Sequence, residues 1–402
     1  MTFENSASQF INDTQSPKVK IAVPYFHSIQ PKRDERWIKS FLTLPLDKFE
    51  NFLIYLRHNK WQTLFLDEMY ELKVRGKKVK GKYCVLTFDD GYADNYIYVY
   101  PLLKKYGMKG TIFASPECID EKRSKALTLF DFWDGKAEAS QLPISAYLNW
   151  EEMQEMQNSG VMDIQAHAMT HTKYFCSDQI VAFHHPGDDC VYPVTNLYPE
   201  LRPYYFHYPN FEELIPWGTP FFEQKSAVVA RICRINPEFS EKVAQTIQNS
   251  TDVNNYNYNE WMKIISSIYQ DYKNKNAVIE SRETEDEYAK RVLYEIVESK
   301  KILEEHLNKP VDFLCWPHGA NNAELHKIAL ANGYKATSVG KSGDDANRPD
   351  RFDRIGIGFN GHYLQSTVLN KYKMNLSIGR FPETWIAKIG NIAVIKKLIK
   401  SI

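Results

Sequence analysis

The sequence has no long apolar segment and no excess of either charge. Its 402 residues include 50 basic and 50 acidic side chains, so the formal net charge is zero. A balanced charge gives no overall attraction to nucleic acid or to an anionic membrane, and we expect neither as a partner. No run is apolar enough to form a transmembrane segment. With 43% hydrophobic residues, the composition indicates a soluble globular protein with a large core.

Closely spaced cysteine pairs are also absent. The six cysteines form no Cys-x-x-Cys motif, so we expect reduced thiols rather than a disulfide framework or a cysteine-rich zinc site. Residues 1–18 are polar and contain no apolar stretch of the signal-peptide kind, which predicts a cytoplasmic location. Residues 386–402 alternate apolar residues with lysines. This pattern favours a helix packed on the core; the weaker alternative is contact with a membrane surface.

Short apolar runs alternate with helical patterns over most of the chain, which predicts an α/β fold with a parallel sheet or barrel. Asn149 with Glu152, and Thr284 with Glu287, predict capped helix starts, and Gly107 predicts a helix end. The expected helices include 46–58, 94–106 and 324–331. The expected strands are 20–26, 61–66, 84–88, 110–114, 161–165, 311–316 and 335–339.

The alternation breaks down between residues 172 and 284. This segment is rich in Pro, Tyr, Phe, His and Asn, with helical patterns only near 239–248 and 261–272. A disordered segment would not carry so many aromatic residues, so we expect an ordered insertion. Its rings can either wall a substrate groove or pack a small core of their own. The predicted organisation is an N-terminal tail at 1–19, a main domain at 20–360 that contains the insertion, and a basic helical tail at 361–402.

Two adjacent carboxylates follow one of the most apolar strands. The segment 84–88 stops abruptly at Asp89, Asp90 and Gly91. In α/β folds, ligand chemistry collects at the carboxyl ends of strands. Adjacent carboxylates repel each other and are costly to desolvate, and a divalent metal is the simplest compensation. Taken alone, the segment is equally consistent with a solvated Asp-Asp-Gly turn.

A pair of histidines, His167 and His171, follows another predicted strand. Neutral imidazoles are standard zinc ligands, and a carboxylate can provide the third ligand. Such a pair alone is more often incidental, but here both signals are expected on the same rim of one fold. Together they predict an open His-His-Asp site, with one carboxylate on the metal and the other acting as a base on water. Residues 184–190 also offer ligands, but a polar turn is the better interpretation.

These segments resemble the NodB-homology polysaccharide deacetylases, carbohydrate esterase family 4. Thr87-Phe88-Asp89-Asp90-Gly91 and His167-x-x-x-His171 are similar to the first two motifs of the family. Trp316-Pro317-His318-Gly319 resembles the third motif, in the branch where it reads aromatic-Pro-aromatic-Gly. Tyr25-Phe26-His27 resembles the opening strand of that branch. The resemblance covers residues 20–172 and 285–360, and the insertion and the C-terminal tail lie outside it.

The resemblance implies a distorted (β/α)7-type barrel that holds one divalent metal. Zinc is the expected ion, with cobalt, nickel or iron as alternatives. The backbone N–H of His318 would lie where the family forms its oxyanion hole. The implied roles are a general base, Asp89; three metal ligands, Asp90, His167 and His171; and substrate contacts from Tyr92, Trp316 and His27.

Two departures from the family pattern leave roles open. The third motif of the family begins with an arginine that holds the catalytic aspartate, whereas Cys315 stands at that position here. Part of the family also lacks this arginine. The second departure is the absence of a clear segment that supplies the catalytic acid. Three histidines are candidates for that role: His318, His362 and His27.

The expected activity is metal-dependent hydrolysis of an N-acyl group, foremost N-acetyl, on an amino sugar in cell-surface polysaccharide or glycolipid biosynthesis. A cytoplasmic enzyme would meet a small lipid- or nucleotide-linked precursor before it met a finished polymer. One alternative is a catalytically impaired carbohydrate-binding protein that keeps the barrel and the metal site. Another is a partner protein that attaches to a membrane surface through its basic tail.

Overall fold

The computed structural model describes residues 20–35, 37–76, 80–142, 145–341, 348–358, 370–371, 373–375 and 377–378. The main sheet is curled and parallel, with the strand order β15-β14-β13-β8-β7-β6-β1-β16. Its strands are β1 (Pro24–Phe26), β6 (Leu86–Phe88), β7 (Gly110–Ala114), β8 (Met162–Ala166), β13 (Phe313–Leu314), β14 (Ala336–Ser338), β15 (Arg351–Phe352) and β16 (Ile355–Gly356).

The two edges of this sheet meet through one interrupted strand. β15 pairs with β14 at one edge, and β16 pairs with β1 at the other. Only Asp353 and Arg354 separate β15 from β16, so the edges come together at this seam. If residues 351–356 are counted as one broken strand, the barrel has seven. The predicted distorted (β/α)7-type barrel with an insertion is confirmed.

Apolar side chains from the strands fill the barrel, among them Val85, Phe113, Phe313 and Phe352. Helix α2 (Leu66–Val74) adds apolar side chains to this core and covers the amino ends of the strands. Lys73 of α2, for example, donates to the backbone carbonyl of Arg351 at the start of β15 across 2.8 Å. The carboxyl ends of the strands are left to carry polar residues.

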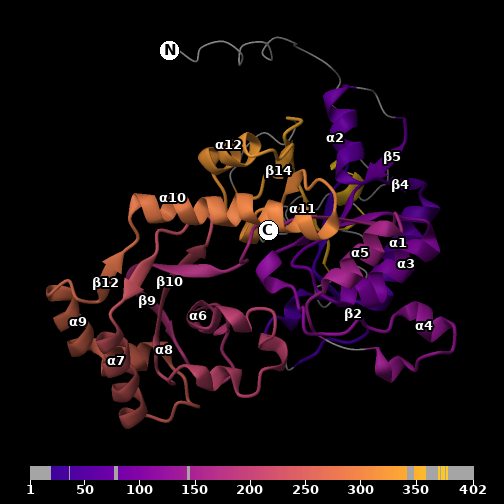
Figure 1. Ribbon diagram of the computed structural model, residues 1–402. Coiled ribbons are helices and arrows are strands. Elements are labelled where there is room, and N and C mark those ends of the chain that lie inside the picture. Colours follow the sequence, from indigo (N-terminus) through magenta and orange to yellow (C-terminus); the bar gives the residue numbers. More distant parts are fainter. Residues whose placement is uncertain are drawn as a thin grey trace, which may run out of the picture.

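Helices surround the barrel (Figure 1). The π-helical turn η2 (Asn95–Val99) leads directly into helix α3. A second π-helical turn, η8 (Tyr294–Glu298), links helices α10 and α11. Two small parallel pairs complete this part: β2 (Ser28–Gln30) with β3 (Thr43–Pro45), and β4 (Trp61–Thr63) with β5 (Lys82–Cys84). The remaining helices are α1 (Leu46–His58), α3 (Tyr100–Tyr106), α4 (Leu129–Trp133), α5 (Trp150–Asn158), α10 (Glu285–Leu293), α11 (Ser299–Leu307) and α12 (Ala323–Ala331).

The helix ends follow the local sequence signals. The Asn149 side chain accepts from the backbone N–H of Glu152 and completes a capping box at the start of α5. Thr284 and Glu287 form the same box at α10. Gly107 ends α3 in the left-handed conformation, with φ 64°. These three predictions are confirmed, because each depends on hydrogen bonds within one turn.

The insertion forms a compact body beside the barrel, and α10 and α11 run from one to the other (Figure 1). A long antiparallel hairpin, β9 (Lys173–Phe183) with β10 (Pro220–Ser226), starts directly after His171. The predicted helical segments are present, whereas the hairpin was not foreseen. Its buried core includes Phe183, Phe222, Phe239 and Trp261. Its other elements are α6 (Val191–Leu197), α7 (Pro237–Ser250), α8 (Tyr258–Ile264), α9 (Ser266–Asn274), and β11 (Cys233–Ile235) paired with β12 (Ile279–Arg282).

All six cysteines are free thiols, as expected. Among the described residues, no helix has the length and apolar character needed to cross a membrane. The predicted N-terminal tail at 1–19 lies outside the described residues, and so does most of the predicted tail at 361–402.

Candidate metal and active site

The two aspartates after β6 face different partners. The backbone N–H of Asp89 donates to the carbonyl of Phe26 across 2.9 Å, which continues the pairing with β1. Asp90 and Gly91 then take positive φ values of 72° and 73°, so the chain turns sharply. Both carboxylates are buried, at 3% and 5% exposure. The turn therefore gives each buried carboxylate its own surroundings.

Asp90 meets both histidines of the second motif. Its Oδ1 lies 3.3 Å from His167 Nε2 and 3.0 Å from His171 Nε2. One potential ligand atom from each of the three residues lies within 4.8 Å of the other two. Such spacing allows one ion to be bound by all three side chains. The structure thus brings together the three predicted metal ligands.

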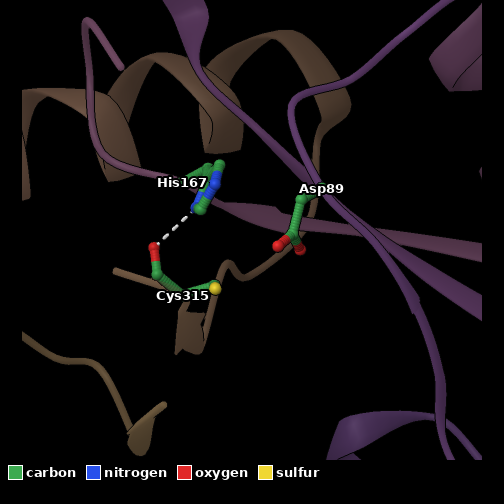
Figure 2. Close-up of side chains that lie close together, drawn as sticks. All are labelled: Asp89, His167 and Cys315. Carbon is green, nitrogen blue, oxygen red and sulfur yellow. Dashed lines mark hydrogen bonds between the residues drawn. The ribbon is translucent and has the colours of Figure 1, made fainter. Parts of the chain in front are cut away.

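The surroundings of this triad fit a metal ion. Asp90 Oδ1 is buried and has no hydrogen-bond partner among the described residues. The other oxygen, Oδ2, accepts from the Tyr92 hydroxyl across 2.9 Å. His167 donates from Nδ1 to the carbonyl of Cys315 across 2.8 Å, which leaves Nε2 for an ion (Figure 2). An unpartnered carboxylate oxygen beside two imidazoles is a set of donors that a divalent cation would satisfy.

The pKa shifts of Asp90 and His171 suit a cation, whereas Cys315 and Asp90 raise the pKa of the third ligand, His167, above its usual range despite its burial. Burial opposes the charge of Asp90, but the His171 and His167 rings beside it hold its pKa well below its usual range. Burial lowers the pKa of His171, despite the attraction of Asp90. An ionised carboxylate and a neutral imidazole are the forms that bind metal.

Glu295 holds the loop that carries His171. Its carboxylate is 1% exposed and accepts from the backbone N–H groups of Met169 and Thr170 at 3.0 and 3.1 Å. It also accepts from the Thr170 hydroxyl across 2.6 Å. The loop needs such support, because Ala168 and His171 both have positive φ. Glu295 lies in η8, far along the chain from the histidines, and our sequence analysis missed it.

Asp89 is held by an arginine that the sequence did not reveal. Arg354 donates from Nη1 to Asp89 Oδ1 across 2.6 Å, and the two side chains are only 14% and 4% exposed. Burial alone would raise the pKa of Asp89, but Arg354 and the nearby histidines hold it below its usual range. The motif position where the family carries an arginine is Cys315, so Arg354 supplies the same contact from the barrel seam.

A second group of potential ligands, Asp89, His167 and Cys315, shares His167 with the triad. In Figure 2, the ring of His167 meets the backbone carbonyl of Cys315, and the carboxylate of Asp89 lies beside them. This group suits a metal less well, because Nδ1 of His167 is taken by that carbonyl and Oδ1 of Asp89 by Arg354. The Asp90 triad is the better metal site.

The remaining candidate residues occupy different places around the triad. The His318 ring packs on the His171 ring at 4.5 Å between centroids, and its Nε2 is buried without a hydrogen-bond partner in the described chain. His27 Nε2 lies 3.9 Å from Asp89 Oδ2. Trp316 is fully buried and lines the cavity, whereas Tyr92 contacts Asp90 directly. His362 lies outside the described residues.

The triad opens into a cavity of about 550 Å³. One side of its wall belongs to the barrel, with Asp89, His167 and Trp316. The other side comes from the insertion, with residues such as Tyr192 and Tyr205. The insertion therefore covers the carboxyl ends of the barrel strands, and its aromatic residues both wall the cavity and pack a separate core.

A third group of potential ligands, His184, Asp188 and Cys190, also has its ligand atoms within 4.8 Å of one another, but its histidine already has partners within the protein. His184 Nδ1 pairs with the Asp188 carboxylate at 2.9 Å, and its Nε2 pairs with the carbonyl of Glu212 at 2.7 Å. Both ring nitrogens are therefore occupied. The expected polar turn accounts for these contacts.

Comparison with known families agrees with this geometry. Residues 76–210 match the family model described as polysaccharide deacetylase. The resemblance to the polysaccharide deacetylases is confirmed. The matched segment contains the aspartate pair and both histidines predicted to bind metal, whereas Trp316, His318 and Arg354 lie beyond it.

Individual polysaccharide deacetylases show the same likeness. The chain is 32% identical over 168 residues to "Putative polysaccharide deacetylase YxkH" of Bacillus subtilis (strain 168), a match that covers 42% of this chain and 48% of that protein. It is 22% identical over 142 residues, 35% of this chain, to the poly-beta-1,6-N-acetyl-D-glucosamine N-deacetylase of Escherichia coli (strain K12). That match covers 20% of the Escherichia coli enzyme. The chain thus spans half or less of the curated relatives it matches.

A solved structure shows the same fold. The de-N-acetylase from Aggregatibacter actinomycetemcomitans superposes with a TM-score of 0.51 and 16% sequence identity. The superposition covers 86% of this chain and 98% of that one. The likeness therefore extends beyond the segment matched by sequence.

Proposed function

We propose that this chain is a metal-dependent amidohydrolase that removes an N-acyl group, foremost acetyl, from an amino sugar. The observation that carries the proposal is the convergence of Asp90, His167 and His171 beside a separately held carboxylate, Asp89. Structural zinc sites use four protein ligands, whereas catalytic sites use three and keep one position open. A bound divalent ion would polarise the acyl carbonyl and lower the pKa of a water molecule.

Asp89 is suited to act as the general base. Its ion pair with Arg354 keeps it ionised and fixes one oxygen, while Oδ2 remains available on the side of His27. As the neighbour of Asp90 in the chain, it lies next to the place where a water molecule would attack. It would accept a proton from that water.

His318 is placed to protonate the leaving amine, although burial and the neighbouring His171 hold its pKa well below its usual range. Its ring packs on the metal ligand His171, and its Nε2 has no partner among the described residues. His27 lies beside Asp89 and is better placed to orient the base. Base and acid would then stand on different sides of the triad. Amide hydrolysis needs this arrangement, because one proton leaves the water and one reaches the amine.

The substrate is proposed from the relatives and from the covered cavity. The Escherichia coli relative is named for an N-acetylglucosamine polymer, which supports an N-acetyl amino sugar as the substrate class. The insertion wall favours a small precursor, lipid- or nucleotide-linked, in cell-surface polysaccharide or glycolipid biosynthesis. Zinc is the proposed ion, with cobalt, nickel or iron as alternatives. The cytoplasmic location, with peripheral membrane contact through the tail, remains a prediction.

A carbohydrate-binding protein without turnover is less well supported. Its main argument is the uncertain catalytic acid, a role for which His318 beside His171 is now the proposed residue. Arg354 now supplies the contact to Asp89, so the base is equipped for catalysis.

The test is acetate release from N-acetylglucosamine and its short oligomers by the zinc-loaded chain. We expect one free amine for each acetate, loss of activity with a chelator, and recovery when zinc is added back. If the sugars bind but release no acetate with any of the four metals, the chain is a binding protein and the proposal is wrong.

A further inference from the structure

Three lysines in the wall of the cavity have no acidic partner. Lys39, Lys173 and Lys341 all line the cavity that contains the Asp90 triad. Within the described part of the chain, none of the three forms an ion pair with a carboxylate. An exposed lysine such as Lys341 needs no partner, whereas Lys39 is buried and Lys173 partly buried, and an ammonium group removed from water does need one.

The arginines of the same wall are different. Arg354 is paired with Asp89, and Arg202 is paired with Glu117. Both arginines thus have a counter-charge within the protein. The unpaired positive charge of the wall is confined to the lysines, which we call the lysine cluster.

Two members of the lysine cluster lie over one aromatic ring. Lys39 Nζ is 3.9 Å from the ring centre of Tyr192, and Lys173 Nζ is 5.4 Å from it. Lys39 is only 8% exposed, although it has no carboxylate beside it. The face of an aromatic ring compensates a buried ammonium group only in part. A bound anion would supply the rest.

The lysine cluster is built from three separate parts of the fold. Lys39 precedes η1 (Ser40–Leu42), and Lys173 opens β9 at the start of the insertion. Lys341 follows β14, and its backbone N–H donates to the carbonyl of Gly319 across 2.7 Å. Like charges from three segments repel one another, and Lys39 and Lys173 lie over the same tyrosine ring. Such an arrangement is costly unless an anion visits it.

One carboxylate, Asp189, shares this side of the cavity and lies near Lys173. Asp353 also lines the cavity, but it lies at the barrel seam, where it accepts from the backbone N–H of Arg354. One acidic group against three ammonium groups leaves an excess of positive charge around Tyr192.

The lysine cluster is close to the reaction centre. The Tyr192 ring meets the His318 ring edge-on at 5.6 Å between centroids. His318 in turn packs on His171, which belongs to the triad. A group bound by the lysines would therefore sit next to the sugar whose amide is cleaved.

We propose that the lysine cluster binds a phosphate group of the substrate, which makes sugar phosphates and sugar diphosphates its substrate class. The inference rests on the proposed deacylase function and identifies the group that the cavity recognises beside the N-acyl sugar. Lysine binds phosphate as a point charge and donates up to three hydrogen bonds. The same chemistry occurs in nucleotide-linked and lipid-linked sugars.

The experiment compares two substrates that differ in the phosphate. The zinc-loaded chain is given N-acetylglucosamine 1-phosphate and the neutral methyl glycoside of N-acetylglucosamine. We expect kcat/KM to favour the phosphate by about tenfold or more, the contribution of one good charge-assisted hydrogen bond. In Lys39→Gln and Lys341→Gln the ratio should fall towards one. Lys341→Arg, which keeps the charge, should keep the ratio.

Lys242→Gln is the matched control. Lys242 also lies over a tyrosine ring, 5.8 Å from the centre of Tyr272, but it is on α7 and does not line the cavity. The ratio should be unchanged in this variant. An equal kcat/KM for both substrates in the unmodified chain would overturn the inference, and so would an equal effect of Lys242→Gln and Lys39→Gln.

Two further outcomes distinguish a failure of the phosphate site from a failure of the proposed deacylase function. If the methyl glycoside is deacetylated but the phosphate gives no advantage, the function stands and the phosphate site is wrong. If neither is hydrolysed, calorimetry with N-acetylglucosamine 1-phosphate tests the site. Binding lost in Lys39→Gln and kept in Lys242→Gln supports the site, and equal binding in the two variants overturns it.

Uridine-diphosphate and polyprenyl-diphosphate N-acetylglucosamine then identify the carrier. An equal preference for N-acetylmuramic acid, which carries a carboxylate, would contradict a phosphate site.

Discussion

Arg354 donates to Asp89 across 2.6 Å, although 265 positions separate them in the chain. The contact exists because the barrel closes at the seam between β15 and β16, where Arg354 lies. It gives the buried Asp89 carboxylate its counter-charge. The arginine that the third motif lacks is thus replaced from a different strand.

Arg354→Met should therefore impair catalysis more than metal binding. Loss of a residue that holds a side chain of the site in place costs about 10–100-fold in activity. The carboxylate of Asp89 would also be left buried without a counter-charge, which costs about 3–5 kcal/mol of stability. Kinetics, metal content and urea unfolding measure the three effects. Adding Asp89→Asn should recover part of the stability, because it removes the uncompensated charge. A double variant no more stable than Arg354→Met would contradict the pairing.

The two aspartates should separate metal binding from turnover. Asp89→Asn is expected to keep the metal and lose activity, because Asp89 is held by Arg354 and not by the triad. His167→Ala should lose the metal, because its Nε2 lies beside Asp90. Metal analysis of the purified variants checks both, with the exposed His58 replaced by alanine as the control. Equal metal loss in Asp89→Asn and His167→Ala would show that the aspartates are misassigned.

The catalytic acid can be identified by comparing substrates whose leaving groups differ in their need for a proton. Aryl acetates leave without protonation, whereas an amine must receive a proton. His318→Ala should therefore lose about 10²–10⁴-fold of its activity on an N-acetyl sugar, with a much smaller loss on 4-nitrophenyl acetate. His27→Ala should reduce both activities to a similar degree, because His27 lies beside the base. An amide-specific loss in His27→Ala instead would assign the acid to His27.

The strand ends and helix caps could be predicted from the sequence, because they depend on local patterns. Asp90, His167 and His171 could be placed on one rim, because parallel strands bring their carboxyl ends together. Arg354 could not be assigned in this way. Its role depends on how the barrel closes, and the strands on either side of it follow a polar segment in which the sequence predicts no strand.

Glu295 and the lysine cluster were hidden for a related reason. Glu295 lies in the helical pattern that follows the insertion, where an acidic residue normally faces solvent. Lys39 and Lys173 each belong to unremarkable local sequence, and Tyr192 brings them together only in the folded chain. The β9–β10 hairpin was missed because its strands carry polar and charged residues among the apolar ones.

Asp94 should make stability depend on pH. Its carboxyl is 1% exposed, and burial raises its pKa to about 6, although Ser28, Gln30 and Asn95 donate to it. The folded state therefore holds this proton more tightly than the unfolded state, in which the pKa is near 4. As pH rises from 4 to 7, the contribution of Asp94 to the free energy of unfolding should fall by about 2 kcal/mol.

Urea unfolding of the unmodified chain and of Asp94→Asn measures this contribution. The variant cannot titrate at this position, so it should gain stability relative to the unmodified chain as pH rises towards 7. A difference that stays constant over this range would show that Asp94 keeps an ordinary pKa.

The insertion should limit the length of the substrate. It is fastened to the barrel rim by an aromatic cluster in which Trp37 donates from Nε1 to the Tyr205 hydroxyl across 3.0 Å. Tyr205 lines the cavity, so this contact holds the wall in place. We expect the unmodified chain to prefer monomeric or carrier-linked N-acetylamino sugars over long poly-N-acetylglucosamine chains. Comparison of kcat/KM for the two classes measures the preference.

Trp37→Ala should weaken the aromatic cluster and raise the relative activity on long chains, because the wall can then move away from the barrel. Trp133→Ala is the matched control: Trp133 is 43% exposed on α4 and does not line the cavity. The control should keep the preference for short substrates. A preference for long chains in the unmodified protein would show that the insertion extends a polymer groove rather than closing a pocket. Equal shifts in the two tryptophan variants would show that the Trp37–Tyr205 contact does not set the length.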